Sequence, residues 1–285
     1  MGHLGRAAQL AILAVVGQGV IYFLTIVLAR RLGAEGFEAY AVASAAFTLM
    51  VMCTPQGLEK YALRLLPALF QRQAWGPIRG YLQFSARRTL TASIVIGLVV
   101  FVWAHYVADY PSATRMAFVA SCLSLPAGAL AHLYVELLSA AGRDIMATAV
   151  FRVVVPTITL VLVGFLLYLP IDVSGAMAVG SWGFAWIVAL VVMALLFRHS
   201  VQKDVWTATP LPERSTWSRE ARPFLTYRLS LGLLSQIGVI ALDRLHPSAT
   251  ATGAYVAAMS TAGLAIVLTT STNRYYSCLL YTSDA

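Results

Sequence analysis

Eight runs of about 20 apolar residues divide the chain, each long enough to cross a bilayer core as a helix. The bilayer core offers no water to the backbone, so a spanning segment must be a helix or part of a closed barrel. The alternation of apolar and polar residues that barrel strands need is missing here. We therefore predict an all-α polytopic membrane protein. Its spans are Leu10 to Ala29, Ala39 to Leu58, Thr89 to Ala108, Met116 to Ser139, Ile145 to Leu169, Ser174 to Phe197, Phe224 to Asp243 and Ala254 to Thr272.

Composition agrees with a membrane environment. Hydrophobic residues make up 59% of the 285 residues and charged residues only 11%, and the mean hydropathy is +0.76. The net charge of +8 could indicate a nucleic-acid partner, but the basic residues gather in alternate loops. Counted from a cytoplasmic N-terminus, the inner loops hold thirteen Lys and Arg residues and the outer loops four. The positive-inside rule therefore predicts that the N-terminus lies on the cytoplasmic side of the membrane, and we expect no nucleic-acid partner.

The cysteines give no sign of a metal or redox site. Cys53, Cys122 and Cys278 lack CxxC spacing and neighbouring histidines, so we predict packing roles, no metal and no cofactor.

Two longer inner segments and a short internal repeat predict two lobes. The segment from Glu59 to Arg88 mixes apolar and basic residues, which predicts a helix extending the second span and another lying on the headgroups. The proline-containing segment from Arg198 to Pro223 indicates a cytoplasmic linker. An Arg-Leu dipeptide followed by a Tyr recurs six spans later, so both copies have the same orientation. The repeat-turn residues are Arg31, Gly33, Tyr40, Asp243, Arg244 and Tyr255.

This repeat divides the chain into parts of unequal completeness. We expect a six-helix N-lobe at 1–200, a linker at 201–223 and two helices of a truncated C-lobe at 224–273. A parallel repeat of six-helix lobes would require four more helices in the second lobe. The segment from Cys278 to Ala285 resembles translated adapter sequence at the end of some metagenomic reading frames. We therefore expect a non-native or disordered tail at 274–285.

Several segments follow the order and spacing of a transporter family. They begin with Gly17-Gln18-Gly19, LARRLGAEGFEAYAVA (Leu28 to Ala43) and GLEKYALRLLPALF (Gly57 to Phe70). They continue with AAGRDIMATAVFRVVVP (Ala140 to Pro156) and LDRLHPSATATGAYVAA (Leu242 to Ala258). Together they resemble the bacterial oligosaccharide flippases of the multidrug/oligosaccharidyl-lipid/polysaccharide exporter superfamily. The chain departs from that pattern at Glu38-Ala39, where the family usually has Gly between Phe and Tyr, and in lacking the last helices.

The resemblance implies flipping of an undecaprenyl-pyrophosphate-linked glycan to the outer leaflet by alternating access of two lobes. A pyrophosphate that leaves the headgroup layer needs fixed positive charge, and the planar fork of Arg suits phosphate oxygens. Arg152 and Arg228 lie inside apolar sequence, about one to two turns from the inner ends of their spans. With Arg64, they are the candidate pyrophosphate ligands. His132 and Glu136 are the candidate charge partners, with Glu136 facing Arg152.

Each candidate also has a simpler interpretation. The two intramembrane arginines could extend to the headgroups, and Glu136 could form a structural ion pair. Pro55, Pro126 and Pro156 could mark fixed kinks in spans two, four and five. We expect a monomer whose partners are membrane lipid, the polyprenyl-pyrophosphate glycan and polysaccharide-assembly proteins.

Other functions compete with flipping. A drug or metabolite antiporter of the same superfamily would need a buried carboxylate in the first lobe, and Glu136 is the only acid well inside spans one to six. A membrane glycosyltransferase or polymerase would need a larger extramembrane loop, and the sequence has no Walker motif, Ser-His-Asp set or metal cluster. A structural scaffold would not explain Arg152 and Arg228. The sequence thus predicts a transporter rather than an enzyme.

Overall fold

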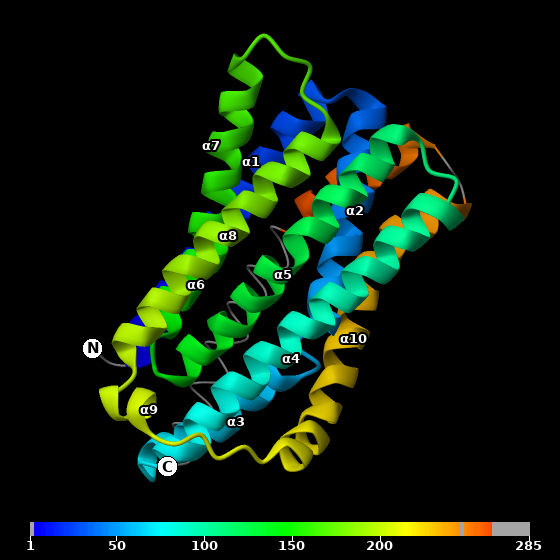
Figure 1. The fold of residues 1–285 in the computed structure, drawn as a ribbon. Coiled ribbons are helices and arrows are strands. Elements are labelled where there is room, and N and C mark those ends of the chain that lie inside the picture. Colours follow the sequence, from blue (N-terminus) through cyan, green and yellow to red (C-terminus); the bar gives the residue numbers. More distant parts are fainter. Residues whose placement is uncertain (1–2, 246–247, 264–285) are drawn as a thin grey trace.

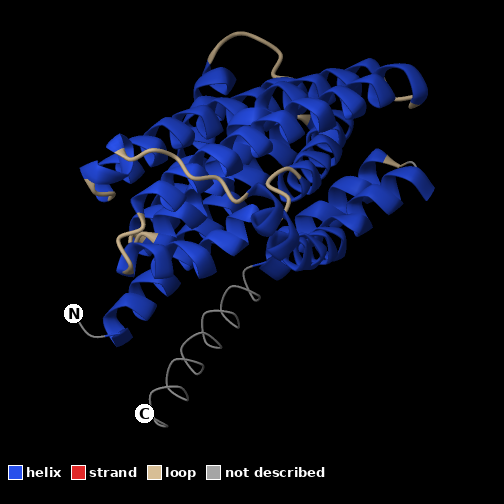
Figure 2. Cartoon of the chain, turned by 60° about the horizontal axis from the view of Figure 1, so that its bottom comes forward, coloured by secondary structure: helices blue, strands red, loops and turns tan. Residues whose placement is uncertain are grey.

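The computed structural model describes residues 3–245 and 248–263, and over them the chain is a bundle of helices joined by loops (Figure 2). Seven of the described helices are long and apolar enough to cross a membrane, which confirms the prediction of an all-α multi-pass membrane protein. The eighth predicted span extends beyond the described residues, and the predicted tail lies outside them. The elements are α1 (His3–Arg31), α2 (Gly33–Cys53), α3 (Leu58–Gln71), α4 (Trp75–Val102), η1 (Trp103–Val107), α5 (Ser112–Ala140), α6 (Asp144–Ala149), η2 (Val150–Val154), α7 (Val155–Tyr168), α8 (Gly175–Ser200), α9 (Lys203–Thr207) and α10 (Arg214–Leu245).

The connections gather at two opposite ends of the bundle (Figure 1). One end holds the N-terminus, α3, the α5–α6 turn, α9 and the start of α10. The α1–α2, α4–α5 and α7–α8 connections lie at the other end. The first end therefore collects the loops with thirteen Lys and Arg residues, and we call it the basic end.

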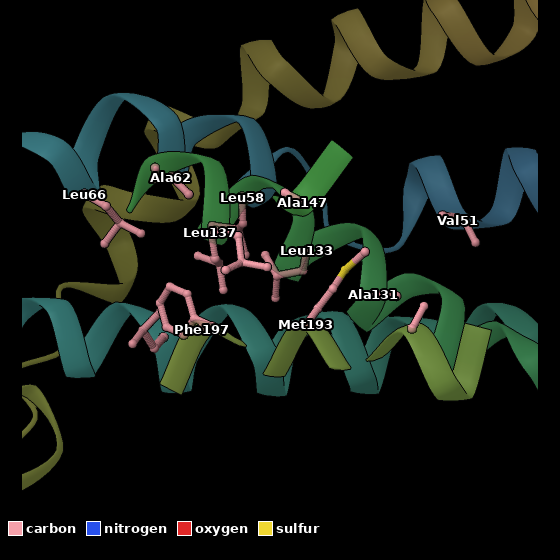
Figure 3. Packing of buried hydrophobic residues seen from close by; sticks show 14 of the residues in the cluster. Val51, Leu58, Ala62, Leu66, Ala131, Leu133, Leu137, Ala147, Met193 and Phe197 are labelled. Carbon is pink, nitrogen blue, oxygen red and sulfur yellow. The ribbon is translucent and has the colours of Figure 1, made fainter. Parts of the chain in front are cut away.

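Helix α5 forms the centre of the bundle, with α2, α3, α4 and α8 packed around it. Within the apolar part of α5, half of the residues are buried. In the apolar parts of α1 and α10 only 11% are buried, so these two helices lie at the periphery. In the close-up of the core, Met193 and Phe197 of α8 lie beside Leu133 and Leu137 of α5 (Figure 3). Because lipid gives helices little hydrophobic reason to associate, such close side-chain packing must hold the bundle together.

Small residues allow the central helices to approach closely. A Cβ added at Gly183 of α8 would overlap Ser124 of α5, and one added at Gly128 of α5 would overlap the Phe47 ring of α2. These contacts explain why glycines are frequent inside the spans.

The second predicted span ends five residues early, at Cys53, because the chain breaks at Thr54–Gly57. Pro55 lies in this break, and both Gln56 (φ 55°) and Gly57 (φ 79°) are left-handed. The amphipathic helix expected after the second span is therefore a separate helix, α3. The predicted second headgroup helix is wrong, because residues 75–88 form the start of α4 and continue directly into span three.

Proline has a different effect in each span. Pro126 lies inside the continuous helix α5. Pro156 follows the π-helical turn η2, because a proline has no N–H for the carbonyl four residues earlier, that of Arg152. A widened turn is one way for a membrane helix to accommodate that loss.

The segment predicted as a linker is shorter than expected. Helix α8 continues to Ser200, α9 occupies part of the segment, and α10 already begins at Arg214 with Pro223 inside it. Only residues 208–213 form an extended connection before α10, which then packs against α2 and α3.

Candidate functional site

A buried ion pair joins α3 to α10. Arg228 Nε lies 3.2 Å from Glu59 Oε1, with side-chain exposures of 16% and 1%. The contact lacks hydrogen-bond alignment: among the described residues, neither Glu59 oxygen nor Arg228 Nε has a hydrogen-bond partner. Burial raises the pKa of the Glu59 carboxyl, and the positive charge of Arg228 opposes this increase. Glu59 is therefore a strongly desolvated acid, and the positive charge of Arg228 favours its ionised form.

A second ion pair joins α3 to α5. Lys60 Nζ donates to Glu136 Oε1 at 2.6 Å, and both side chains are largely buried. Glu136 thus has a different partner from the one predicted, Arg152. Adjacent residues of α3 bind opposite charges on two different helices, so α3 connects the central helix to α10.

The remaining predicted residues lie around these pairs. The His132 ring packs against Phe151 and Trp186, with ring centroids 4.9 and 5.0 Å apart. Arg152 lies in η2 with its guanidinium 5.5 Å from the centroid of the Phe151 ring. Arg228, Arg152 and Lys60 are the positive groups within electrostatic range of His132. We call the set formed by Glu59, Lys60, His132, Glu136, Arg152 and Arg228 the charge cluster.

Close backbone approach fixes two elements of the charge cluster. A Cβ at Gly17 of α1 would lie 2.1 Å from the Arg152 carbonyl oxygen, so α1 rests directly on η2. A Cβ at Gly57, just before Glu59, would lie 2.3 Å from the Ala221 carbonyl oxygen of α10. Only glycine permits these separations.

An open groove lies beside the charge cluster, between α3 and α10. It has a volume of about 750 Å³. Arg64 and Lys60 supply positive charge, while Phe224 and Tyr227 supply aromatic surface. The lining of this α3–α10 groove consists of Lys60, Leu63, Arg64, Pro223, Phe224 and Tyr227.

Positive charge extends from the charge cluster into the groove. Lys60 and Arg228 are each paired with a carboxylate, and Arg64 adds a further positive charge in the lining of the adjoining groove. Such an arrangement can attract an anion away from water, because a low dielectric strengthens the interaction. His, Cys, Asp and Glu side chains of the described segments do not form a group of three that could hold a metal ion.

The predicted repeat-turn residues lie at the opposite end of the bundle. Arg31 ends α1, and Gly33 begins α2 with a φ of 69°. Asp243 accepts a hydrogen bond from the Tyr110 hydroxyl at 3.0 Å. These residues are remote from the charge cluster and shape helix ends. The other three members are Tyr40, stacked on Phe37, Tyr255, in contact with Gly238, and Arg244, whose side chain the structure does not describe.

Sequence reasoning missed the two residues that organise the cluster, Glu59 and Lys60. From the sequence pattern, Lys60 is one of the inner-loop charges and Glu59 is the start of an amphipathic segment. The signal for both is an adjacent acid and base that follow Pro55-Gln56-Gly57 after a single leucine. Because adjacent residues of a helix point in different directions, the acid and the base at the start of a new helix can each reach a different neighbouring helix.

No protein-family model, no curated protein and no solved structure matches this chain.

Proposed function

We propose that the protein moves a polyprenyl-pyrophosphate-linked glycan between the leaflets of a bacterial cytoplasmic membrane, with its N-terminus in the cytoplasm. The observation that supports this most is the open α3–α10 groove, whose lining carries the positive charges of Lys60 and Arg64 beside the two buried ion pairs. A pyrophosphate needs fixed positive charge to leave the headgroup layer. The resemblance to oligosaccharide flippases points to the same substrate.

The ion pairs suggest how the substrate could be coupled to movement. Arg228 faces Glu59 without a well-aligned hydrogen bond, so phosphate oxygens can offer it better acceptors. Transfer of Arg228 from Glu59 to the pyrophosphate would remove an attraction between α3 and α10. Substrate binding would thereby loosen the contact between α10 and the bundle, as alternating access requires.

Binding to the purified protein in detergent provides the first test. Native mass spectrometry should show tighter binding of undecaprenyl pyrophosphate than of undecaprenol. Arg64→Gln should weaken pyrophosphate binding about tenfold, because it removes one charge-assisted contact from the groove. Arg72→Gln is the matched control, since Arg72 is an exposed residue of the same segment outside the groove. Equal binding of the two lipids would contradict the proposal.

Translocation requires a second measurement. In proteoliposomes loaded with undecaprenyl pyrophosphate on the inner leaflet, an added membrane-impermeant phosphatase should cleave the lipid only as it reaches the outer leaflet. Cleavage at the rate of protein-free liposomes, despite normal binding, would leave a lipid-binding protein rather than a flippase.

A proton-coupled antiporter of the same superfamily is the second candidate, and Glu59 favours it. This acid is 1% exposed and its pKa is raised by burial, as a proton carrier requires. The antiporter hypothesis predicts uptake of a small cationic drug driven by a proton gradient. Glu59→Gln should abolish that uptake, and undecaprenyl pyrophosphate should not compete with it.

A further inference from the structure

A second cavity lies at the basic end, between α4 and the N-terminal turns of α10. Its volume is about 630 Å³. Arginines and hydroxyl groups dominate its lining, and none of the described carboxylates contributes to it. We call it the basic pocket, and its polar lining includes Arg87, Arg88, Thr91, Arg214, Ser215 and Ser218.

The linker is held against α4 and forms one wall of the basic pocket. Arg79 Nη1 donates to the Ala208 carbonyl at 2.7 Å, and Leu211 N–H donates to the Gly76 carbonyl at 3.1 Å. A Cβ at Gly80 would lie 2.6 Å from the Leu211 carbonyl oxygen. Contacts this close fix the path of the linker, and hence the position at which α10 begins.

Side-chain packing holds the two walls of the basic pocket together. Trp217 of α10 is 2% exposed and packs on Tyr81 and Phe84 of α4, which holds the N-terminal turns of α10 in place. The Arg88 guanidinium lies 6.0 Å from the centroid of the Phe84 ring, and its Nε donates to Gln56 Oε1 at 2.8 Å. This contact uses one of five N–H donors of Arg88. The position of Arg88 is thus fixed by its neighbours while most of its donors stay available.

An apolar surface continues from the basic pocket along α4. From Arg87 and Thr91, the helix places exposed apolar side chains at the following turns, where a three- to four-residue spacing keeps them on one side. These side chains are Ile94, Val95, Leu98 and Val99, between 54% and 62% exposed. A basic pocket at the end of an exposed apolar helix face matches the two chemical parts of an anionic lipid.

We propose that the basic pocket binds the phosphate headgroup of an anionic phospholipid, with its acyl chains along the exposed face of α4. The guanidinium groups of Arg87, Arg88 and Arg214 supply charge-assisted donors, and the hydroxyls of Thr91, Ser215 and Ser218 supply neutral ones. The N-terminal end of α10 adds unpaired backbone N–H groups and a positive dipole end.

This lipid site is separate from the proposed transport path. The lining residues of the basic pocket and of the α3–α10 groove do not overlap, and they use different faces of α10. A lipid bound in the basic pocket would hold the linker and α10 against α4, so it would stabilise the protein without being transported.

Native mass spectrometry of the purified protein can compare phosphatidylglycerol with phosphatidylcholine, which has the same phosphodiester without net charge. We expect preferential retention of phosphatidylglycerol. Replacing Arg87, Arg88 and Arg214 together by Gln should weaken it at least about tenfold. The control replaces Arg72, Arg143 and Arg198 by Gln, which removes the same charge from exposed positions at the same end. The control should retain most of the lipid affinity.

One further substitution separates loss of lipid binding from loss of folding. Ser215→Asp is compatible with the N-terminus of α10, because a negative charge is favourable there, yet it repels an anion from the pocket. Its unfolding temperature in phosphatidylcholine should be unchanged, whereas stabilisation by phosphatidylglycerol should be lost. Equal loss of lipid in the control triple variant, unchanged phosphatidylglycerol binding in Ser215→Asp, or displacement of the lipid by millimolar inorganic phosphate would overturn the assignment. The last result would indicate a site for the free anion.

Discussion

At the scale of single residues, we expect substitutions in the buried Glu59–Arg228 pair to have a large effect on stability. Glu59→Ala would leave the Arg228 charge buried and uncompensated, which costs about 3 kcal/mol of stability. Replacing both residues with apolar ones, as in Glu59→Leu with Arg228→Met, should recover most of that loss because no charge remains buried. Denaturation by SDS in mixed micelles, with both variants measured alongside the parent chain, gives the comparison. A double variant no more stable than Glu59→Ala would show that the pair is not coupled.

Glu59 should also make stability depend on pH. Its pKa in the folded protein lies above the ordinary value of 4.5, so between these two values the folded state binds more protons than the unfolded state. The contribution is therefore fully present below pH 4.5 and is lost as the pH rises through the folded-state pKa. Glu59→Gln should remove this part of the pH dependence. Unfolding midpoints measured at intervals from pH 4.5 to pH 8 would contradict the prediction if both proteins showed the same slope.

Substitutions of Arg152 can show whether this residue binds the pyrophosphate or only extends its charge to the headgroups. If its guanidinium binds pyrophosphate through two donors, Arg152→Lys should restore only part of the affinity that Arg152→Ala loses. One charge-assisted contact corresponds to roughly a tenfold change in affinity. Native mass spectrometry with undecaprenyl pyrophosphate measures this per folded molecule. Full recovery by Lys would instead support the simpler interpretation.

At the scale of the elements, apolar length predicts helices reliably but not where they break. Helices α1, α5 and α8 coincide with predicted spans, because a run of apolar residues in lipid has no alternative to a helix. The break before α3 and the early start of α10 depend on packing across the bundle, which one-dimensional patterns do not contain. The charge cluster shows the same division. Its members on the long spans were candidates from the sequence, whereas Glu59 and Lys60 join it only because α3 is a separate helix.

The break at Gly57 can be tested against a matched glycine. Gly57 and Gly142 share a φ of 79°, but only Gly57 has backbone atoms of α10 within 4 Å of an added Cβ. Gly142→Ala should cost about 1–2 kcal/mol from backbone strain alone. Gly57→Ala should cost this and a further 1–3 kcal/mol or so, because α10 must move. The difference in SDS-unfolding free energy between the two variants measures the helix contact. Equal losses would mean that α10 does not depend on this approach.

At the scale of the whole molecule, the two ends of the bundle differ in charge, and this difference predicts the orientation. Thirteen Lys and Arg residues lie in the connections and helix ends of the basic end, so that end should face the cytoplasm. Thr209, exposed in the linker, and Asp172, exposed in the α7–α8 connection, lie at opposite ends. In a background with the native cysteines replaced, an impermeant maleimide added to intact cells lacking an outer membrane should label Asp172→Cys. Thr209→Cys should react only after the membrane is opened. Each variant controls for the other, because both positions are accessible in the folded protein. The reverse labelling pattern would invert the topology and place the charge cluster at the outer leaflet. The α3–α10 groove would then open to the outer surface, where it could receive an anionic lipid only after translocation.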